Sequence, residues 1–295
     1  MSQHKSGLIS RRQALISIAT IAAGTAFRPV AAFSTPARDK IRFAVIGDWG
    51  TGDSETSQIA GLMAQTHRSA ALDFVIAAGD NIYPDGAGRR FSKNFEQPFS
   101  SLLYERVSFH AVLGNHDVRD GRQDQIRYPL FNMGGRSYYT LRKGDGLAEF
   151  FMLDSTDFDR QQAQWLEEAL RASPAKWKIA VFHHPIYSSG RMHGSSQELR
   201  RALEPLFVRY KVNVVFSGHD HIYERIRPQQ GIQYFVTGAG GKVRHHGVDL
   251  KSPFREVSYD ESNHFMLIEA DNRQITFSAI SGQGIIVDSG TIRQD

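Results

Sequence analysis

The chain has no cysteine among its 295 residues. It can therefore contain no disulfide framework, no thiolate metal site and no cysteine nucleophile. Beyond residue 32 there is also no Pro/Gly/Ser-rich linker, internal repeat or low-complexity tract. We therefore expect residues 41–295 to form a single domain, since the chain offers no point at which to divide it.

An excess of positive charge is lacking as well, once the N-terminus is set aside. Four of the 35 basic side chains lie in residues 1–32, which hold no acid, so 31 basic and 31 acidic side chains remain. A body that is neutral overall argues against a protein that binds nucleic acid through bulk positive charge. No nucleic-acid partner is expected.

Residues 1–32 have the order of an export signal. Arg11 and Arg12 precede an uncharged run of 15 residues, Gln13 to Phe27, and small residues follow at 30–32. The arginine pair is typical of the twin-arginine (Tat) class, and the run is too short to span a bilayer as an anchor. We expect a cleaved signal peptide read by the Tat export machinery, a leader at 33–40, and a periplasmic or secreted protein with no stable membrane anchor.

Apolar segments alternate with helical patterns through the first three quarters of the chain. Short apolar runs end at Asp48, Asp80 and Asp117, and helices are expected at 54–70, 92–104, 161–172 and 195–210. After residue 221 come four strands with no helix between them, and a long polar loop at 240–260. This order predicts an α/β fold, an αββα four-layer sandwich. Two mixed β-sheets would pack face to face, with helices on both outer faces.

Five of the apolar strands end in polar clusters: GDWG (47–50), GDNIY (79–83), GNHD (114–117), HH (183–184) and GHDH (218–221). Parallel strands place their carboxyl ends at one edge of a sheet, where ligands bind. The alternative to a ligand site is that these residues only form turns at the strand ends. Five such clusters in order, each after an apolar strand, disfavour this alternative. The residues expected to meet there are Asp48, Asp80, Tyr83, Asn115, His116, His184, His219 and His221.

These side chains have the chemistry of a metal site. Carboxylates, imidazoles, a phenol and an amide oxygen suit first-row metals, and a carboxylate can bridge two ions, as in phosphate-ester hydrolases. His219 and His221 would face the site in an extended chain while Asp220 faces away. His183 is expected to support the site or pack beside it, since adjacent strand residues face opposite ways.

The five motifs resemble the signature of calcineurin-like metallophosphoesterases and, among them, of purple acid phosphatases: GDxG, GDxxY, GNH[DE], VxxH and GHxH. The resemblance covers residues 41–280. Gly50 stands where other metallophosphoesterases carry a histidine ligand, and Tyr83 is the purple acid phosphatase replacement. The chain resembles the small, single-domain type.

The resemblance implies two metal ions that share Asp80. A trivalent iron would have Asp48, Asp80, Tyr83 and His221 as ligands. A divalent Fe, Zn or Mn ion would have Asp80, Asn115, His184 and His219. His116 and His193 would be catalytic and would bind substrate together with Asn115. The basic loop that holds His245 and His246 is read as a solvated surface or as a rim contact for an anionic substrate.

The function expected from this set is an exported acid phosphatase. It would hydrolyse small-molecule phosphate monoesters by attack of a metal-bound hydroxide, while His116 or His193 assists the leaving alkoxide. A phosphodiesterase or nucleotide pyrophosphatase on the same scaffold is the first alternative. A non-catalytic exported metal-binding protein is the second, and the presence of His116 disfavours it.

Overall fold

The structure, a computed structural model, describes residues 40–294. The signal peptide and most of the leader expected at residues 1–39 lie outside these residues and stay predictions. No helix within the described range is long and apolar enough to cross a membrane.

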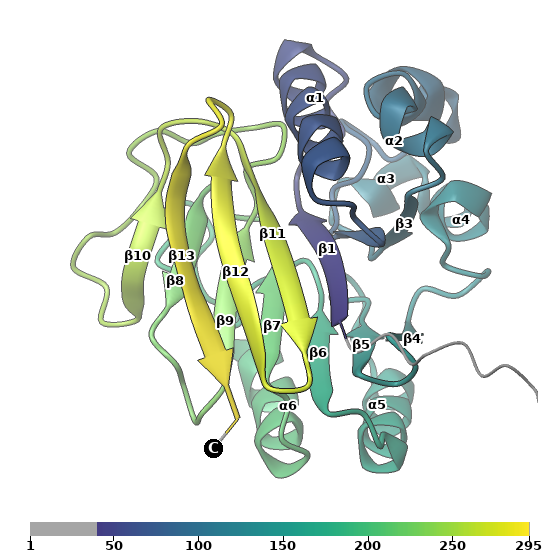
Figure 1. Ribbon diagram of the computed structural model, residues 1–295. Coiled ribbons are helices and arrows are strands. Elements are labelled where there is room, and N and C mark those ends of the chain that lie inside the picture. Colours follow the sequence, from purple (N-terminus) through teal and green to yellow (C-terminus); the bar gives the residue numbers. More distant parts are fainter. Residues whose placement is uncertain (1–39, 295) are drawn as a thin grey trace, which may run out of the picture. The chain divides into compact units, whose positions relative to one another are not determined.

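The first sheet is mixed and has six strands in the order β13-β12-β11-β1-β2-β3 (Figure 1). β1, β2 and β3 run parallel, whereas β11, β12 and β13 join them through antiparallel pairs. The strand bounds are β1 Lys40–Ile46, β2 Phe74–Ala77, β3 Ser108–Ala111, β11 His264–Asp271, β12 Gln274–Ser281 and β13 Ile286–Arg293.

The second sheet is also mixed and has seven strands in the order β10-β8-β9-β7-β6-β5-β4. Its centre, β5 to β9 by way of β6 and β7, is parallel, and both flanks are antiparallel. The bounds are β4 Tyr139–Lys143, β5 Ala148–Met152, β6 Trp177–Val181, β7 Val214–Ser217, β8 Tyr223–Ile226, β9 Gln233–Thr237 and β10 Arg255–Tyr259.

Large aromatic side chains hold the two sheets face to face. Phe43 of β1 lies edge-on to Phe150 of β5, with ring centroids 5.2 Å apart, and Phe235 of β9 contacts Phe277 of β12 at 4.8 Å. The next residue along β5, Phe151, belongs instead to the cluster that packs β5–β7 against α5 and α6. Alternate residues of one strand thus serve two layers, as the pleat requires.

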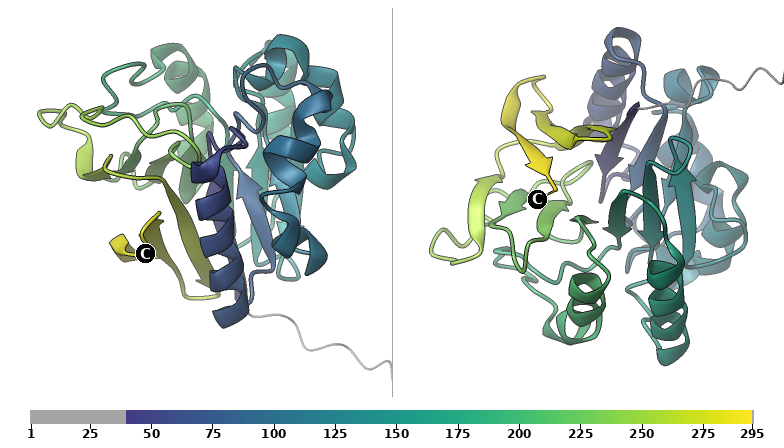
Figure 2. Two further views of the ribbon diagram at one scale, coloured as in Figure 1. Left: turned by 90° about the horizontal axis from the view of Figure 1, so that it is seen from above. Right: turned by 60° about the horizontal axis from the view of Figure 1, so that its bottom comes forward.

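Helices lie on two sides of the paired sheets, as Figures 1 and 2 show. The four-layer α/β arrangement is therefore confirmed. The helix bounds are α1 Ser54–Ser69, α2 Ser100–Tyr104, α3 Asp117–Asp120, α4 Arg122–Arg127, α5 Arg160–Ala172 and α6 Gln197–Arg209, with 3₁₀ turns at Gly88–Arg90 and Pro129–Phe131. Asp53, Asp159 and Ser196 cap α1, α5 and α6 by accepting a backbone N–H bond.

Three local predictions were wrong. The helix expected at 92–104 is a π-helical turn, Ser92–Glu96, followed by the short α2. Two strands were missed: β8, and β10, which lies within the segment read as a polar loop. Both are only four or five residues long, so their alternation is too short to stand out from a loop.

Candidate metal centre

The polar clusters follow the carboxyl ends of β1, β2, β3, β6 and β7, so strands of both sheets contribute to one place. Three of these residues, Asp48, Asp80 and His219, have φ angles of 53°, 49° and 71°. A left-handed backbone is uncommon for side chains other than glycine and often occurs at functional sites. It turns each of these side chains sharply out of the strand direction.

Four of the expected residues meet at the Tyr83 hydroxyl. Its oxygen lies 3.1 Å from Asp48 Oδ1, 2.9 Å from Asp80 Oδ2 and 3.2 Å from His221 Nε2. His221 Nε2 is in turn 3.4 Å from Asp48 Oδ1. These are the four side chains that the sequence pattern assigned to the trivalent ion, and they form one compact cluster.

A second group of side chains adjoins the first through Asp80. His183 Nε2 lies 3.1 Å from Asn115 Oδ1 and 3.5 Å from Asp80 Oδ1. One nitrogen from each of His183, His184 and His219 comes within 4.8 Å of the other two. The structure thus brings together the residues expected at the divalent site, Asp80, Asn115, His184 and His219, and adds His183 to them.

His183 is the main departure from the sequence-based expectation. It is fully buried, and it is also within 4.8 Å of the nearest carboxylate oxygens of Asp48 and Asp80. Its Nδ1 is 3.0 Å from the Ala78 carbonyl, so Nδ1 carries the proton and Nε2 faces the oxygens of Asp80 and Asn115. The strand β6 ends at Val181, so the alternation that was expected to turn His183 away no longer applies at this residue.

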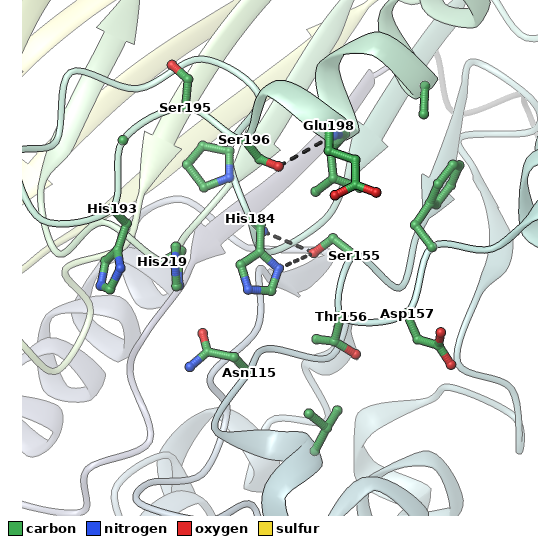
Figure 3. A pocket seen from close by; sticks show the side chains of 16 residues that line it. Asn115, Ser155, Thr156, Asp157, His184, His193, Ser195, Ser196, Glu198 and His219 are labelled. Carbon is green, nitrogen blue, oxygen red and sulfur yellow. Dashed lines mark hydrogen bonds between the residues drawn. The ribbon is translucent and has the colours of Figure 1, made fainter.

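His184 occupies a different environment from His183. Its Nδ1 is 2.9 Å from the Ser155 hydroxyl, which also accepts its backbone N–H at 3.0 Å. The ring is partly exposed and lines an open pocket (Figure 3). Burial and the neighbouring His183 lower the pKa of His184 to about 3, so the ring is neutral at ordinary pH.

The expected extended geometry at His219–His221 is not found. The backbone turns at this point, with Asp220 N–H bonded to Gly218 O at 2.9 Å and Ile222 N–H to Asp220 O at 2.7 Å. As a result His219 lies against His184 and His193, whereas His221 lies against Tyr83 and Asp48. Each histidine therefore serves a different half of the centre.

The electrostatics of the centre fit a bound cation. Asp48 and Asp80 are 0% and 1% exposed, and within residues 40–294 neither forms an ion pair with a lysine or arginine. Burial, followed by the charges of Asp48 and Asp80, raises the pKa of the Tyr83 phenol well above its usual value. Two buried carboxylates with acceptor groups facing one another require positive charge between them. The donor set fits first-row metal ions.

The histidines of the centre differ in charge: burial opposes the charge on His183, but Asp80 and Asp48 outweigh it and raise the pKa of that imidazole. Burial and the surrounding histidines hold the pKa of His219 far below its usual range. Burial also opposes the charge on Asp80, but His183, the His116 N–H and His116 outweigh it and lower the pKa of that carboxyl. Deprotonated imidazole and carboxylate are the forms that bind metal ions.

The two expected catalytic histidines lie beside the centre. The His116 backbone N–H donates to Asp80 Oδ1 at 2.8 Å, and His116 Nδ1 donates to the Pro84 carbonyl at 2.7 Å. His116 Nε2 lies 3.4 Å from Arg119 Nη2. The His193 ring lies 4.0 Å from the His219 ring. Asp220, which points away from the centre as expected, accepts the His193 backbone N–H at 3.3 Å and so fixes the His193 loop.

Several residues that matter to the geometry were missed in the sequence. Asp117 is fully buried and accepts backbone N–H bonds from Asn81, Ile82 and Gly114, so it ties the Asp80 loop to the Asn115 loop. Its place as the last residue of GNHD was the available signal. Lys242 lies with Nζ 3.8 Å above the Tyr83 ring, and nothing local in the sequence indicates this contact.

Gly50 has a steric reason to be glycine. A Cβ at this position would lie 1.6 Å from the Asn81 carbonyl oxygen, and the Gly50 carbonyl accepts the Tyr83 backbone N–H at 2.8 Å. The backbone of the first motif is thus pressed against the loop that carries Tyr83. A histidine cannot occupy the position in this geometry, and the Tyr83 phenol reaches the same cluster from the neighbouring loop.

Two cavities, each of about 630 Å³, flank the centre. The first is lined by Asn115, His184, His193 and His219 on the side of the centre, and Figure 3 shows its other wall, which the 155–158 loop and the start of α6 supply. The second lies beside His221 and is lined by Lys242, Arg244 and His245. His245 therefore lies at the rim of this second cavity, whereas His246 does not line it.

Comparison with known proteins identifies the family. Residues 41–223 match the calcineurin-like phosphoesterase family. Purple acid phosphatase 17 of Arabidopsis thaliana is 32% identical over 72% of this chain and 72% of its own length. Tartrate-resistant acid phosphatase type 5 of Rattus norvegicus is 27% identical over 87% of this chain and 91% of its own.

A solved structure shows the same fold. The purple acid phosphatase from yellow lupin (Lupinus luteus) seeds superposes with a TM-score of 0.71 and 18% identity, over 87% of this chain and 54% of that one. The family expected from the five motifs is therefore confirmed. On its sequence and its fold, the chain belongs to the calcineurin-like phosphoesterase family, as a phosphatase of the purple acid phosphatase type.

Proposed function

We propose that the protein is an exported acid phosphatase that hydrolyses small-molecule phosphate monoesters at a centre of one trivalent iron and one divalent Fe, Zn or Mn ion. The observation that carries the proposal is the convergence of Asp48, Asp80 and His221 on the Tyr83 hydroxyl within 3.2 Å. A phenol among two buried carboxylates is a costly arrangement without a cation, and a hard trivalent ion suits this donor set.

The proposed ligands of the two ions follow the two groups of side-chain contacts described above. Tyr83, Asp48 and His221 belong to the iron, and Asp80 lies between both groups. The divalent ion has the remaining candidates, Asn115, His183, His184 and His219. When bound, the ions neutralise the phosphoryl oxygens and supply a nucleophile from water at low or neutral pH.

The surrounding residues have defined tasks in this proposal. Asn115, His116 and His193 hold the phosphate, and protonated His116, through its Nε2, or the His193 ring passes a proton to the leaving oxygen. The bond from His116 Nδ1 to the Pro84 carbonyl fixes which nitrogen is available. Asp220 keeps the His193 loop in place through backbone N–H bonds.

Export belongs to the proposal as well. It rests on the sequence of residues 1–32, in which Arg11-Arg12 precede an uncharged segment. Transport by the Tat machinery carries folded proteins, which suits a protein that is loaded with metal before export. The expected destination is the periplasm or the medium.

One set of measurements tests the activity. The purified protein is analysed for metals, its visible spectrum is recorded, and its rates on p-nitrophenyl phosphate and bis(p-nitrophenyl) phosphate are compared across pH. We expect close to two metal ions per chain, a visible band, and faster hydrolysis of the monoester, with the optimum at acid pH. Faster hydrolysis of the diester would favour the phosphodiesterase alternative, and no turnover by metal-loaded protein would favour the non-catalytic one.

A further inference from the structure

The first cavity beside the centre has a negatively charged outer wall. Its lining includes the carboxylates of Asp157 and Glu198 and, within the part of the chain that the structure describes, no lysine or arginine. Figure 3 shows both carboxylates on the opposite side of His184 from His193 and His219. A molecule held at the histidines would therefore extend toward the two acids.

Neither acid is neutralised by a neighbour. Among residues 40–294 the ion pairs do not include Asp157 or Glu198, and both residues are exposed. The guanidinium of Arg122 reaches Thr156 of this wall at 2.7 Å, but it is paired with Asp154 at 2.6 Å. Both carboxylates are thus available to a ligand.

The start of α6 also faces this cavity and carries partial positive charge. Ser196 caps that end by accepting the Leu199 N–H, and Glu198 lies in the first turn. A helix N-terminus is equivalent to roughly half a positive charge, which one full carboxylate exceeds. The net field of the wall therefore favours a cation over an anion.

The rest of the cavity lining combines hydroxyl side chains, from Ser155, Thr156, Ser195 and Ser196, with apolar ones. Val118, Phe158, Leu199 and Ala202 supply the apolar part together with Pro185. The apolar part of the lining can hold a short carbon skeleton, and the carboxylates of Asp157 and Glu198 in the same cavity can bind a polar or charged end group. The wall thus offers contacts to an alcohol that carries a cationic end group.

Basic side chains also lie near the centre, outside the lining of the first cavity: Arg119 Nη2 is 3.4 Å from His116 Nε2. Lys242, Arg244 and His245 line the second cavity, beside His221, together with Glu55 and Glu261. The lysine and arginine of the second cavity are matched by two glutamates, so it lacks the excess of negative charge that Asp157 and Glu198 give the first cavity.

We infer that the first cavity binds the leaving alcohol and selects phosphate monoesters whose alcohol bears a protonated amine, with Asp157 and Glu198 as the residues that set this preference. The inference rests on the proposed phosphatase activity and adds the class of substrate. The two carboxylates attract an ammonium group on the substrate, and they repel a carboxylate there.

Three substrates of equal length test the inference: O-phosphoethanolamine, 2-hydroxyethyl phosphate and phosphoglycolate. They differ at the far end in an ammonium, a hydroxyl or a carboxylate. The kcat/KM of each is measured for the wild type, Asp157→Asn, Glu198→Gln and the double variant. Glu168→Gln, an exposed residue of α5 outside the cavity, is the matched control.

We expect the wild type to prefer the ammonium over the hydroxyl and the hydroxyl over the carboxylate. Each single substitution in the cavity should lower the ratio of kcat/KM for the ammonium substrate to kcat/KM for the carboxylate substrate by roughly two- to fivefold, the range of a solvent-exposed charge pair. Glu168→Gln should leave this ratio unchanged. Equal rates on all three substrates, or ratios that the cavity variants do not change, would overturn the inference and leave the phosphatase intact. If the protein hydrolyses neither these three substrates nor p-nitrophenyl phosphate, both the proposed function and this inference are overturned.

Discussion

At the scale of single residues, Tyr83 is the side chain on which the trivalent-iron assignment depends. Tyr83→Phe keeps the ring, its packing and the contact with Lys242, but removes the oxygen that lies 2.9 Å from Asp80. A tyrosinate bound to ferric iron absorbs visible light, so we expect the oxidised wild type to be violet to pink and the variant to lose that band. The measurement is the visible spectrum with iron content. A coloured Tyr83→Phe variant would show that another group is the chromophore.

The adjacent histidines 183 and 184 differ in what they contact, and their variants should differ in metal content. His183 reaches Asp80 and Asn115, whereas the Nδ1 of His184 is bonded to Ser155. We expect His183→Ala to lose more bound metal than His184→Ala, and Asn115→Ala to lose the divalent ion before the iron. Elemental analysis of the three variants checks this order. Greater metal loss in His184→Ala than in His183→Ala would support the ligand role that the family resemblance implied for His184.

His116 should affect turnover and not metal content. Its side chain is held by the Pro84 carbonyl, and its Nε2 is 4.0 Å from Asp80 Oδ2. We expect His116→Ala to retain both ions and to lose kcat by roughly 10²–10⁴-fold, the usual contribution of an acid–base group. Parallel metal analysis and steady-state kinetics separate the two effects. Metal loss in step with activity would assign His116 a structural role.

At the scale of the elements, strand β8 holds the His193 loop through a buried acid. Glu224 is fully buried and accepts the Ser189 N–H at 2.8 Å. Burial raises the pKa of Glu224 from 4.5 to about 7. The folded chain therefore binds a proton here that the unfolded chain has released, and this group makes the protein less stable as pH rises from about 4.5 to about 7.

Glu224→Gln should remove that loss of stability. Relative to the wild type, the free energy of unfolding of the variant should rise by about 3 kcal/mol between pH 4.5 and pH 7.5, since the pKa of Glu224 is raised from 4.5 to about 7 and one pKa unit is about 1.4 kcal/mol. Denaturant unfolding of both proteins at equal metal content across this range gives the difference. A difference that stays constant with pH would mean that Glu224 titrates normally in the folded protein.

At the scale of the whole molecule, the proposed export would depend on Arg11 and Arg12, which lie outside the described residues. Arg11→Lys with Arg12→Lys keeps the charge but removes the guanidinium pair. We expect the precursor of the double variant to remain inside the cell. Fractionation with phosphatase assays of each compartment checks this. Normal export of the double variant would exclude the Tat assignment and leave a general signal peptide.

The sequence by itself determined the family, the layered α/β order and most of the residues that the structure brings together at the candidate centre. Apolar strands that end in GD, GNH or GHDH are local signals, because the strand and the polar residue that follows it are adjacent in the chain. Parallel strands then place their carboxyl ends at the same edge of a sheet. Asp48, Asp80 and Tyr83 were therefore predictable as neighbours before any coordinates.

The tertiary structure decided what depends on contacts between distant segments. His183 and His184 are adjacent and chemically identical, and only the positions of Asp80, Asn115 and Ser155, at least 29 residues away, distinguish them. The two cavities could not be predicted from the sequence either. Asp157, in the loop after β5, and Glu198, in α6, line one cavity only in the folded chain. Periodicity reports which residues face inward, whereas the position of one loop relative to another follows from the packing of the whole sheet pair.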